Sequence, residues 1–414
     1  PLGPNLVGIG LSRRLLELGP RIAEVDKDYT RLLAGLRGEL GGSWEYDAWV
    51  SYTRGEEKEL LRNDASFSRV QQGLLVDPLT GNCVDPSNGC VPLNLFGEGN
   101  LSQAGVDFIS VAPYVSTIER EQKLISAFVR GTLFSLPAGD VATAIGAEWR
   151  EDSGDLIADE ALFSGDTLGY RAFSNVVGKE SVSEIYAEVL VPVLSDVPLV
   201  RYLGVEFGGR LSSYDNAGEL ETWKLGLDWE PFEGVRFRTM AQRSARAPNL
   251  GEAFLLPYDE EGTAVFQDPR EDPCSASADP VGNGLSDVCI AQGIPASELG
   301  VFEAALGVPV TFTLGGNPDL EPEIAETFTA GIVFSMFDSW TLSVDYFEID
   351  VEDTIGQSDP LFVCWDPNNT DRKTCDKISR NTVTYDISAV EATNANLGQL
   401  KTTGYDTQLN YMTE

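Results

Sequence analysis

The sequence predicts an all-β fold: an antiparallel up-and-down transmembrane β-barrel with long extracellular loops that contain short helices. Three observations support this prediction. Apolar and polar residues alternate in paired runs, connections within pairs are short while most connections between pairs are long, and one strand face is apolar while the other is charged. This combination is typical of barrels of the outer-membrane type.

The period of two in the alternating runs predicts strands, and the runs come in pairs. Five pairs precede a single eleventh strand at Leu400–Tyr411. The pairs are Tyr29–Leu40 with Trp44–Thr53, Gln122–Ser135 with Val141–Asp152, Glu184–Leu194 with Val200–Ser213, the hairpin Trp223–Met240, and Glu326–Ser335 with Trp340–Val351.

The connections between pairs are mostly long, and only Tyr214–Glu219 is short. The long ones are Arg54–Glu121, Ser153–Ser183, Ala247–Ala325 and Glu352–Gln399. A Greek-key sandwich has no reason to sort its loops in this way, so the sorting favours a barrel. Helical spacing within the loops predicts helices over Ala65–Leu75 and over Ser297–Gly307, the second capped by Ser297.

The composition of the two strand faces indicates whether the apolar face contacts lipid or the dry core of a soluble protein. On one strand Trp223 and Trp229 are six residues apart on an apolar face, about 20 Å at the rise of a strand. This is close to the apolar band of about 25 Å in outer-membrane barrels. The opposite face carries charges, such as Lys224 and Asp228, that are costly to bury. The alternative is a soluble β-sandwich or propeller, for which strands this long are unusual.

The charge and the residue types exclude several functions. A net charge of −36 argues against nucleic acid as a partner, because phosphate contacts need clustered Lys and Arg. Histidine is absent, which removes Ser-His-Asp catalysis and His-ligated zinc or haem from these residues. There is no run of 18 apolar residues, so no transmembrane helix is predicted. We therefore expect no enzyme activity, no cofactor and no metal. The acidic run Tyr258–Pro273 offers oxygen ligands for calcium, but it lacks calcium-loop spacing and is predicted to be a solvated loop.

The six cysteines form three couples that are local in sequence, all in the long loops, and none has C-x-x-C spacing. Neighbour pairing predicts the disulfides Cys83–Cys90, Cys274–Cys289 and Cys364–Cys375, and hence an oxidising compartment. Each would close a loop of about 8 to 16 residues and stabilise it by roughly 2 to 3 kcal/mol. It is the simplest of the possible connectivities, and zinc is the weaker alternative.

Two longer motifs lie on either side of the longest loop: "RSARAPNLGEAF" at Arg243–Phe254 and "GGNPDLEPEIAETFTAGI" at Gly315–Ile332. In this order they resemble the barrel domain of TonB-dependent outer-membrane receptors. "EIYAEVLVPV" at Glu184–Val193 and "LKTTGYDTQL" at Leu400–Leu409 resemble the same family, so the resemblance extends over nearly the whole chain.

The resemblance implies an N-terminal plug domain, a TonB-contacting box and 22 strands, of which about 11 are predicted here. Bacterial single-chain barrels have an even number of strands. We therefore expect residues 1–414 to be a partial barrel domain without the N-terminal plug and the C-terminal strands. An unpaired part-barrel should not be stable alone, because it exposes strand edges and lipid-facing surface.

The function implied by the resemblance is uptake of a scarce nutrient across the outer membrane of a Gram-negative bacterium. The ligand would be a ferric siderophore, cobalamin or an oligosaccharide. Partners would be outer-membrane lipid and, through the plug, the inner-membrane TonB complex that energises transport. A passive porin-like channel is the main alternative. An outer-membrane enzyme and a soluble secreted β domain are two further ones.

At the rim, prolines of the two motifs should shape the chain where strands meet the loop. Asn249, Glu252, Asn317 and Glu323 are expected to cap or brace that rim. Direct ligand contact is the second interpretation, and the candidate ligand-binding residues are Arg243, Arg246, Asn249, Glu252 and Asn317.

Overall fold

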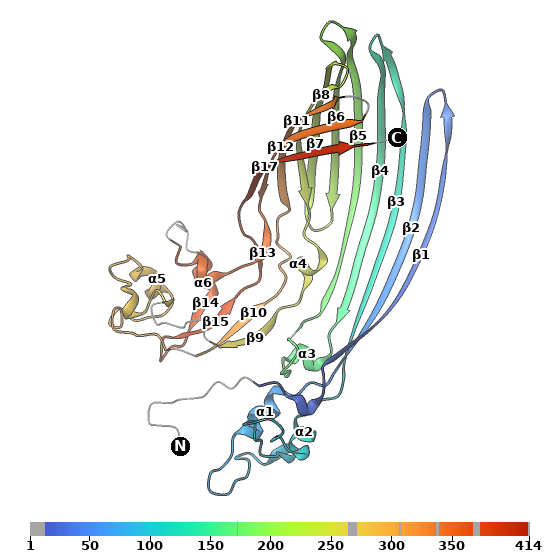
Figure 1. Cartoon of the computed structure of the whole chain (residues 1–414). Helices are drawn as coiled ribbons and strands as arrows, with labels where there is room; N and C mark the ends of the chain where they lie inside the picture. The colour runs from blue at the N-terminus through green and yellow to red at the C-terminus, as the bar shows by residue number, and fades with distance from the viewer. Residues whose placement is uncertain are drawn as a thin grey trace. The chain divides into compact units, whose positions relative to one another are not determined.

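The computed structural model describes residues 13–171, 173–263, 271–305, 308–336, 339–366 and 373–412. Within these residues, eleven strands form one antiparallel sheet in the order β1-β2-β3-β4-β5-β6-β7-β8-β11-β12-β17 (Figure 1). Their bounds are β1 (Ile22–Gly41), β2 (Trp44–Arg62), β3 (Tyr114–Leu136), β4 (Gly139–Ile157), β5 (Val176–Val197), β6 (Val200–Tyr214), β7 (Gly218–Phe232), β8 (Val235–Arg246), β11 (Glu323–Met336), β12 (Trp340–Glu352) and β17 (Leu400–Tyr411). The predicted fold class and strand count are confirmed.

The predicted strand pairs are also confirmed, with corrections to their lengths. β17 has the predicted bounds, whereas β1 to β5 are longer than predicted. The added residues, such as the polar stretch 54–62 of β2, lack the apolar alternation by which a half-buried strand is recognised. Between β11 and β12, residues 337 and 338 lie outside the described residues.

The chain divides into two compact units. The first comprises Pro1–Asp28, Glu56–Ile118 and Leu156–Asn175, and the second comprises Tyr29–Gly55, Glu119–Asp155 and Val176–Glu414. The strands β1 to β4 have residues in both units, whereas the strands from β5 onward lie in the second unit.

The first unit contains η1, which precedes β1, and the helices of two loops around a small apolar core. The helices are η1 (Leu16–Leu18), α1 (Phe67–Leu74), η2 (Ser87–Gly89), α2 (Gln103–Ile109) and α3 (Glu160–Ser164). The prediction of a helix within Ala65–Leu75 is confirmed by α1, which begins after Ser66 because the Ser66 hydroxyl accepts a bond from the Arg69 amide. α1 and α2 contribute Val70, Val106 and Ile109 to one buried cluster.

In the second unit two long loops contain further elements. The loop after β8 has α4 (Leu250–Phe254), β9 (Tyr258–Thr263), η4 (Ala276–Ala278), α5 (Ser286–Ala291) and β10 (Pro309–Leu314). The loop after β12 has β13 (Ile355–Gln357), α6 (Pro360–Val363), η5 (Lys373–Lys377), β14 (Ile378–Arg380), β15 (Ile387–Glu391) and β16 (Asn394–Asn396). They combine into a four-stranded sheet, β14-β15-β10-β9, and a pair, β13-β16. We call the described residues of 258–314 and 358–392 the loop module.

The predicted helix over Ser297–Gly307 is wrong for residues 297–305, and residues 306 and 307 lie outside the described residues. The chain makes turns instead. Gly300 has a φ of 74°, and the amides of Val301 and Phe302 both donate to the carbonyl of Glu298. A left-handed glycine interrupts helical propagation. The α-helix that precedes this segment is α5, which ends at Ala291. Of the acidic run Tyr258–Pro273, residues 264–270 lie outside the described residues.

The register in the second unit separates an apolar face of the main sheet from a charged face. On β7, Trp223, Leu225 and Leu227 are each more than 40% exposed, whereas the alternate positions are less exposed. Pairing places Phe328 of β11 in the row of Leu225, through Ala241 of β8. An exposed apolar face across neighbouring strands is the arrangement that the prediction of lipid contact requires.

The other face carries ion pairs between strands. Arg238 of β8 donates two bonds to Asp345 of β12, at 2.8 and 2.7 Å, across the small Gly331 of β11. The ammonium group of Lys224 of β7 pairs with Glu206 of the neighbouring β6 and with Glu188 of β5. This is the face that would line a barrel lumen, and its charges are satisfied by one another rather than buried unpaired.

Candidate functional site

The first rim motif forms a capped turn of helix at the end of β8. The Asn249 side chain accepts a bond of 2.9 Å from the Glu252 amide, and the Glu252 carboxylate accepts one of 2.8 Å from the Asn249 amide. This reciprocal pair is a capping box, which satisfies amides that the first turn of α4 would leave unpaired. Pro248 lies just before it, where a fixed backbone angle suits the entry into a helix.

Arg246 joins the two motifs. Its guanidinium donates to Glu252 at 2.8 Å and to Glu323, the first residue of β11, at 2.6 Å. The other carboxylate oxygen of Glu323 accepts a bond of 2.7 Å from the amide of Ile355, in the loop after β12. One arginine therefore ties the beginning of the long loop to its end, and Glu323 extends the contact to the next loop.

Asn317 completes the connection from the second motif. Its amide donates to the Glu252 carbonyl at 2.9 Å, and its side chain donates to the Asn394 carbonyl at 3.1 Å. Asn394 in turn donates to the Glu252 carbonyl at 3.1 Å. The preceding Gly316 is required by close approach, because a Cβ there would lie 2.8 Å from the carbonyl of Ala253. We call Arg246, Asn249, Glu252, Asn317, Glu323 and Asn394 the rim latch.

Arg243 lies apart from the latch. It pairs with Trp223 on β7 and with Glu326 on β11, so it belongs to the same face of the sheet as Trp223. Arg246 is three positions further on, and successive strand residues point to opposite faces. The Nε atom of Arg243 is buried without a hydrogen-bond partner among the described residues. The structure thus brings four of the five candidate ligand residues together and separates Arg243.

The latch residue that no sequence motif predicts is Asn394, and the same holds for its neighbour Asn396. Asn396 accepts a bond of 3.0 Å from the Glu321 amide and donates to the carbonyls of Glu321 and Asp353 at 2.8 Å each. Both asparagines lie on the short strand β16. No local pattern marks them, because their partners are more than 40 residues away in the chain.

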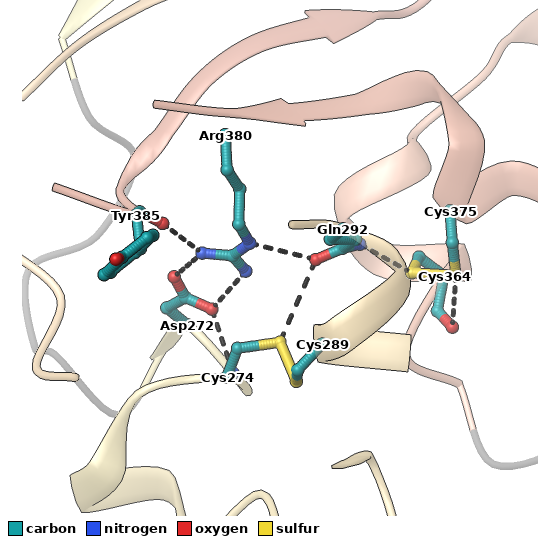
Figure 2. The surroundings of a disulfide bond; sticks show 8 residues. All are labelled: Asp272, Cys274, Cys289, Gln292, Cys364, Cys375, Arg380 and Tyr385. Atoms are coloured by element: carbon teal, nitrogen blue, oxygen red, sulfur yellow. Dashed lines mark hydrogen bonds and ion pairs between the residues drawn. A yellow bond between two sulfur atoms is a disulfide. The ribbon is translucent and has the colours of Figure 1, made fainter. Parts of the chain in front are cut away.

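All three predicted disulfides are present: Cys83–Cys90, Cys274–Cys289 and Cys364–Cys375. The last two lie in the loop module, and Figure 2 shows that their surroundings converge on Arg380. The Arg380 guanidinium donates to both carboxylate oxygens of Asp272, at 2.7 and 2.8 Å. Gln292 lies between the two disulfides and accepts a bond of 3.0 Å from Arg380 Nε.

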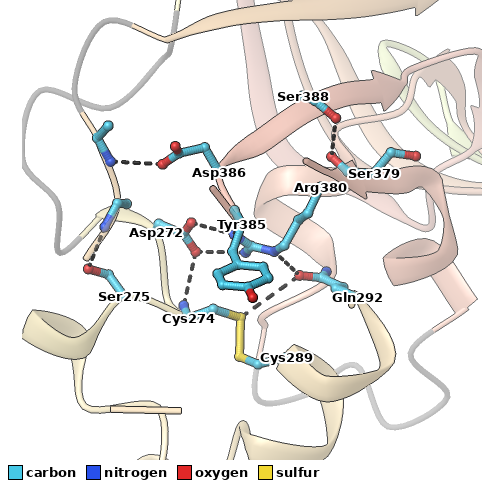
Figure 3. A network of polar contacts seen from close by, with 12 residues as sticks. Asp272, Cys274, Ser275, Cys289, Gln292, Ser379, Arg380, Tyr385, Asp386 and Ser388 are labelled. Atoms are coloured by element: carbon cyan, nitrogen blue, oxygen red, sulfur yellow. Dashed lines mark hydrogen bonds and ion pairs between the residues drawn. A yellow bond between two sulfur atoms is a disulfide. The ribbon is translucent and has the colours of Figure 1, made fainter. Parts of the chain in front are cut away.

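Further polar contacts surround this centre (Figure 3). Asp386, which is buried, accepts a bond of 2.8 Å from the amide of Ala305, and Ser275 accepts one of 3.2 Å from the amide of Ala304. Each of these bonds fixes an otherwise irregular backbone segment. The module is therefore held by side chains where regular secondary structure is short.

The side chains of the rim latch and those around Arg380 hold the loops in position. Among the described residues no group of three or more His, Cys, Asp and Glu side chains is arranged to hold a metal ion. No helix in the described part of the chain is long and apolar enough to cross a membrane. Ion pairs, caps and disulfides here fix the course of the loops.

The architecture defines a class: an antiparallel sheet of long strands with an apolar and a charged face, short turns at one end and structured loops at the other. A family model described as TonB dependent receptor-like, beta-barrel matches residues 4–412. The chain belongs to this family of outer-membrane receptors and transporters. No curated protein matches the sequence.

Solved structures resemble the chain in fold. The ferric enterobactin receptor PfeA of Pseudomonas aeruginosa matches with a TM-score of 0.52 and 15% identity, over 93% of this chain and 41% of that one. The siderophore receptor PirA of Acinetobacter baumannii matches with 0.45 and 14%, over 89% and 42%. The RagAB peptide transporter matches with 0.48 and 10%, over 95% and 35%. The chain thus spans less than half the length of each of these three.

Proposed function

We propose that the chain forms part of the wall and the outer loops of a receptor in the outer membrane of a Gram-negative bacterium. The receptor would bind a scarce nutrient among its loops and import it. Family membership over residues 4–412 is the observation that carries this proposal. The charged face of the sheet supports it, because Lys224, Arg236 and Arg238 would face a wet or plugged lumen.

The finer part of the proposal concerns energy and ligand. We propose that the inner-membrane TonB complex energises transport through a plug domain, and that this chain is the partial barrel, without that plug and without the C-terminal strands. The ligand would be a ferric siderophore, cobalamin or an oligosaccharide. The rigid loops support recognition of a defined ligand, because loops that are already ordered lose less entropy on binding.

The five rim residues belong to this proposal with separate roles. Arg246, Asn249, Glu252 and Asn317 already bond to one another or to nearby backbone, so their main role is to brace the rim. Ligand contact by these four and by Arg243 stays a prediction. Asn317→Asp would test it: loss of ligand binding with unchanged protection of the latch amides from hydrogen exchange would indicate contact.

The test of the function uses the host that carries the gene. A deletion strain is grown with iron, cobalamin or oligosaccharide as the limiting nutrient, and uptake of the affected nutrient is measured with and without a protonophore. Saturable uptake that stops with the protonophore is the expected result. Uptake that persists and rises linearly with concentration would instead indicate the porin-like channel, and unchanged growth on all three nutrients would contradict the proposed ligand classes.

A further inference from the structure

The two long loops of the second unit share one folded core. β10 pairs antiparallel with β9 of its own loop and parallel with β15 of the other, so it is the strand that joins the loops. Val310 of β10 lies in the same buried cluster as Ile378, Ile387 and Val390. The buried cluster of the second loop therefore includes a strand residue of the first loop.

A buried ion pair joins the loops at a second place. The side chains of Asp272 and Arg380 are each 1% exposed. Both side chains make further hydrogen bonds: Arg380 also donates to the carbonyl of Tyr385 at 3.0 Å and to Gln292, while Asp272 accepts from the amide of Cys274 at 3.0 Å. A buried pair with this geometry is tolerated, but removing one partner leaves an uncompensated buried charge.

No covalent bond among the described residues crosses between the loops. Cys274–Cys289 lies within the first loop and Cys364–Cys375 within the second. Contact between the two disulfides runs through Gln292, whose Nε2 donates to Cys364 Sγ at 3.3 Å. Phe302 and Tyr385 add an edge-to-face ring contact across the loops, with centroids 6.1 Å apart. Each loop is closed by its own disulfide, whereas the contacts described between the two loops are noncovalent and therefore reversible.

We propose that the two loops form a single cap that assembles and moves as one body, and that an unpaired charge at Asp272 or Arg380 takes the whole cap apart. The shared sheet and core make independent movement of either loop costly. The proposal rests on contacts within the loop module and holds whichever nutrient the receptor takes up.

The experiment is hydrogen exchange, read by mass spectrometry, on the full-length receptor in detergent micelles. Arg380→Met leaves Asp272 buried and unpaired. We expect amides in both loops, in residues 272–294 and 378–391, to exchange faster together, by about a hundredfold or more, as for opening of a destabilised unit. Amides of β11 and β12 should keep their rates.

The matched control is Lys377→Met in the same loop. Lys377 pairs with Glu391 at 3.5 Å, but the two side chains are 31% and 55% exposed. Pairs this exposed contribute little, so exchange should change less than about threefold. Faster exchange after Arg380→Met in residues 378–391 alone, with residues 272–294 unchanged, would overturn the proposal.

A second variant covers the case in which Arg380→Met prevents the receptor from folding. Asp272→Leu combined with Arg380→Met removes both charges and leaves apolar side chains in the same place. We expect this double variant to fold, and we expect the amides of both loops to be protected from exchange about as well as in the unchanged receptor. If it folds with one loop protected and the other exchanging freely, the loops are independent and the single cap is refuted.

Discussion

At the scale of single residues, the rim latch is organised around Arg246. Its side chain is 44% exposed, yet it bonds to two glutamate side chains that are only 22% and 16% exposed. The planar guanidinium of arginine has several N–H donors in fixed directions and can bind two carboxylates at once, which the compact ammonium of lysine does less well. The arginine and asparagine of the R-A-P-N motif and the glutamate that follows them thus have a common physical purpose, which is to fix how the chain leaves one strand and re-enters the next.

Arg246→Gln should loosen the latch without unfolding the sheet. Because the arginine is partly exposed, we expect a loss of about 1 kcal/mol, seen as roughly fivefold faster exchange of the α4 amides. Arg201→Gln is the control, since Arg201 pairs with Glu230 and Glu233 and is 46% exposed, but lies away from the latch. Equal effects of both variants on α4 would contradict a local role for Arg246.

Asp166 makes the first unit sensitive to acid. Burial alone would raise the pKa of this carboxyl, but bonds from the Ser66 hydroxyl and the Ser68 amide outweigh burial and hold the pKa below its usual range. A lowered folded-state pKa contributes stability that is complete above the unfolded value, about 3.9, and is lost as the pH falls through the folded value.

We therefore expect the loop that contains α1 to be cut faster by an acid-active protease such as pepsin below about pH 4, by severalfold relative to pH 5. The comparison is Asp166→Asn, which cannot ionise. Its cleavage rate, corrected for the pH profile of the protease on an unstructured peptide, should already be raised at pH 5 and should change little on acidification. An equal acid response in both forms would assign the effect to another group.

At the scale of elements, the sequence predicts what is repeated locally and misses what is assembled from distant parts. β7 and β17 follow from a period of two, and α1 follows from its helical spacing. β10 and β15 are short, and their parallel pairing joins residues that are far apart in sequence. Nothing in either segment specifies the other, so the loop module could be predicted only as two separately stapled loops. The latch was half predictable for the same reason: its motif residues stand out, and Asn394 does not.

The apolar face of β7 gives a prediction for a whole strand. Leu227 lies between Trp223 and Trp229 on the exposed face. If lipid covers this face, Leu227→Arg near the middle of the membrane should cost about 2 to 4 kcal/mol of folding free energy. Folding of the full-length receptor into lipid vesicles, followed by its heat-modifiable mobility in gels, would measure the loss.

The control for that variant is an arginine on the opposite face. Thr329 of β11 pairs with Met240 of β8 and belongs to the charged face, because Gly331, two residues on, lies between Arg238 and Asp345. Thr329→Arg should cost less than about 1 kcal/mol in a wet lumen. The assignment of faces would be wrong if Thr329→Arg were the more damaging of the two.

At the scale of the whole molecule, the acidic residues that give the net charge of −36 lie in two environments, the charged face of the sheet and the loops. On the charged face of the sheet, acidic side chains are matched by lysines and arginines of neighbouring strands, as at Asp228 with Arg236. In the loops, many carboxylates serve as caps and turn acceptors, as Asp77 does for the amide of Leu79. The cations are thus concentrated where strands must lie side by side, and the surplus negative charge is left to regions that water can reach.

The open main sheet gives the last prediction. In the described residues its order runs from β1 to β17 without closing, so these two strands are its edges. Both edges expose large apolar side chains: Leu36 of β1 is 73% exposed and Tyr405 of β17 is 75% exposed. Unpaired apolar edges are templates for association with other chains. The 414-residue chain produced alone should therefore aggregate when it is diluted from urea into plain buffer, whereas detergent should reduce the aggregation. Light scattering coupled to size exclusion would measure this, and a monomer that unfolds and refolds reversibly without detergent would show that the edges are protected in a way this strand order does not provide.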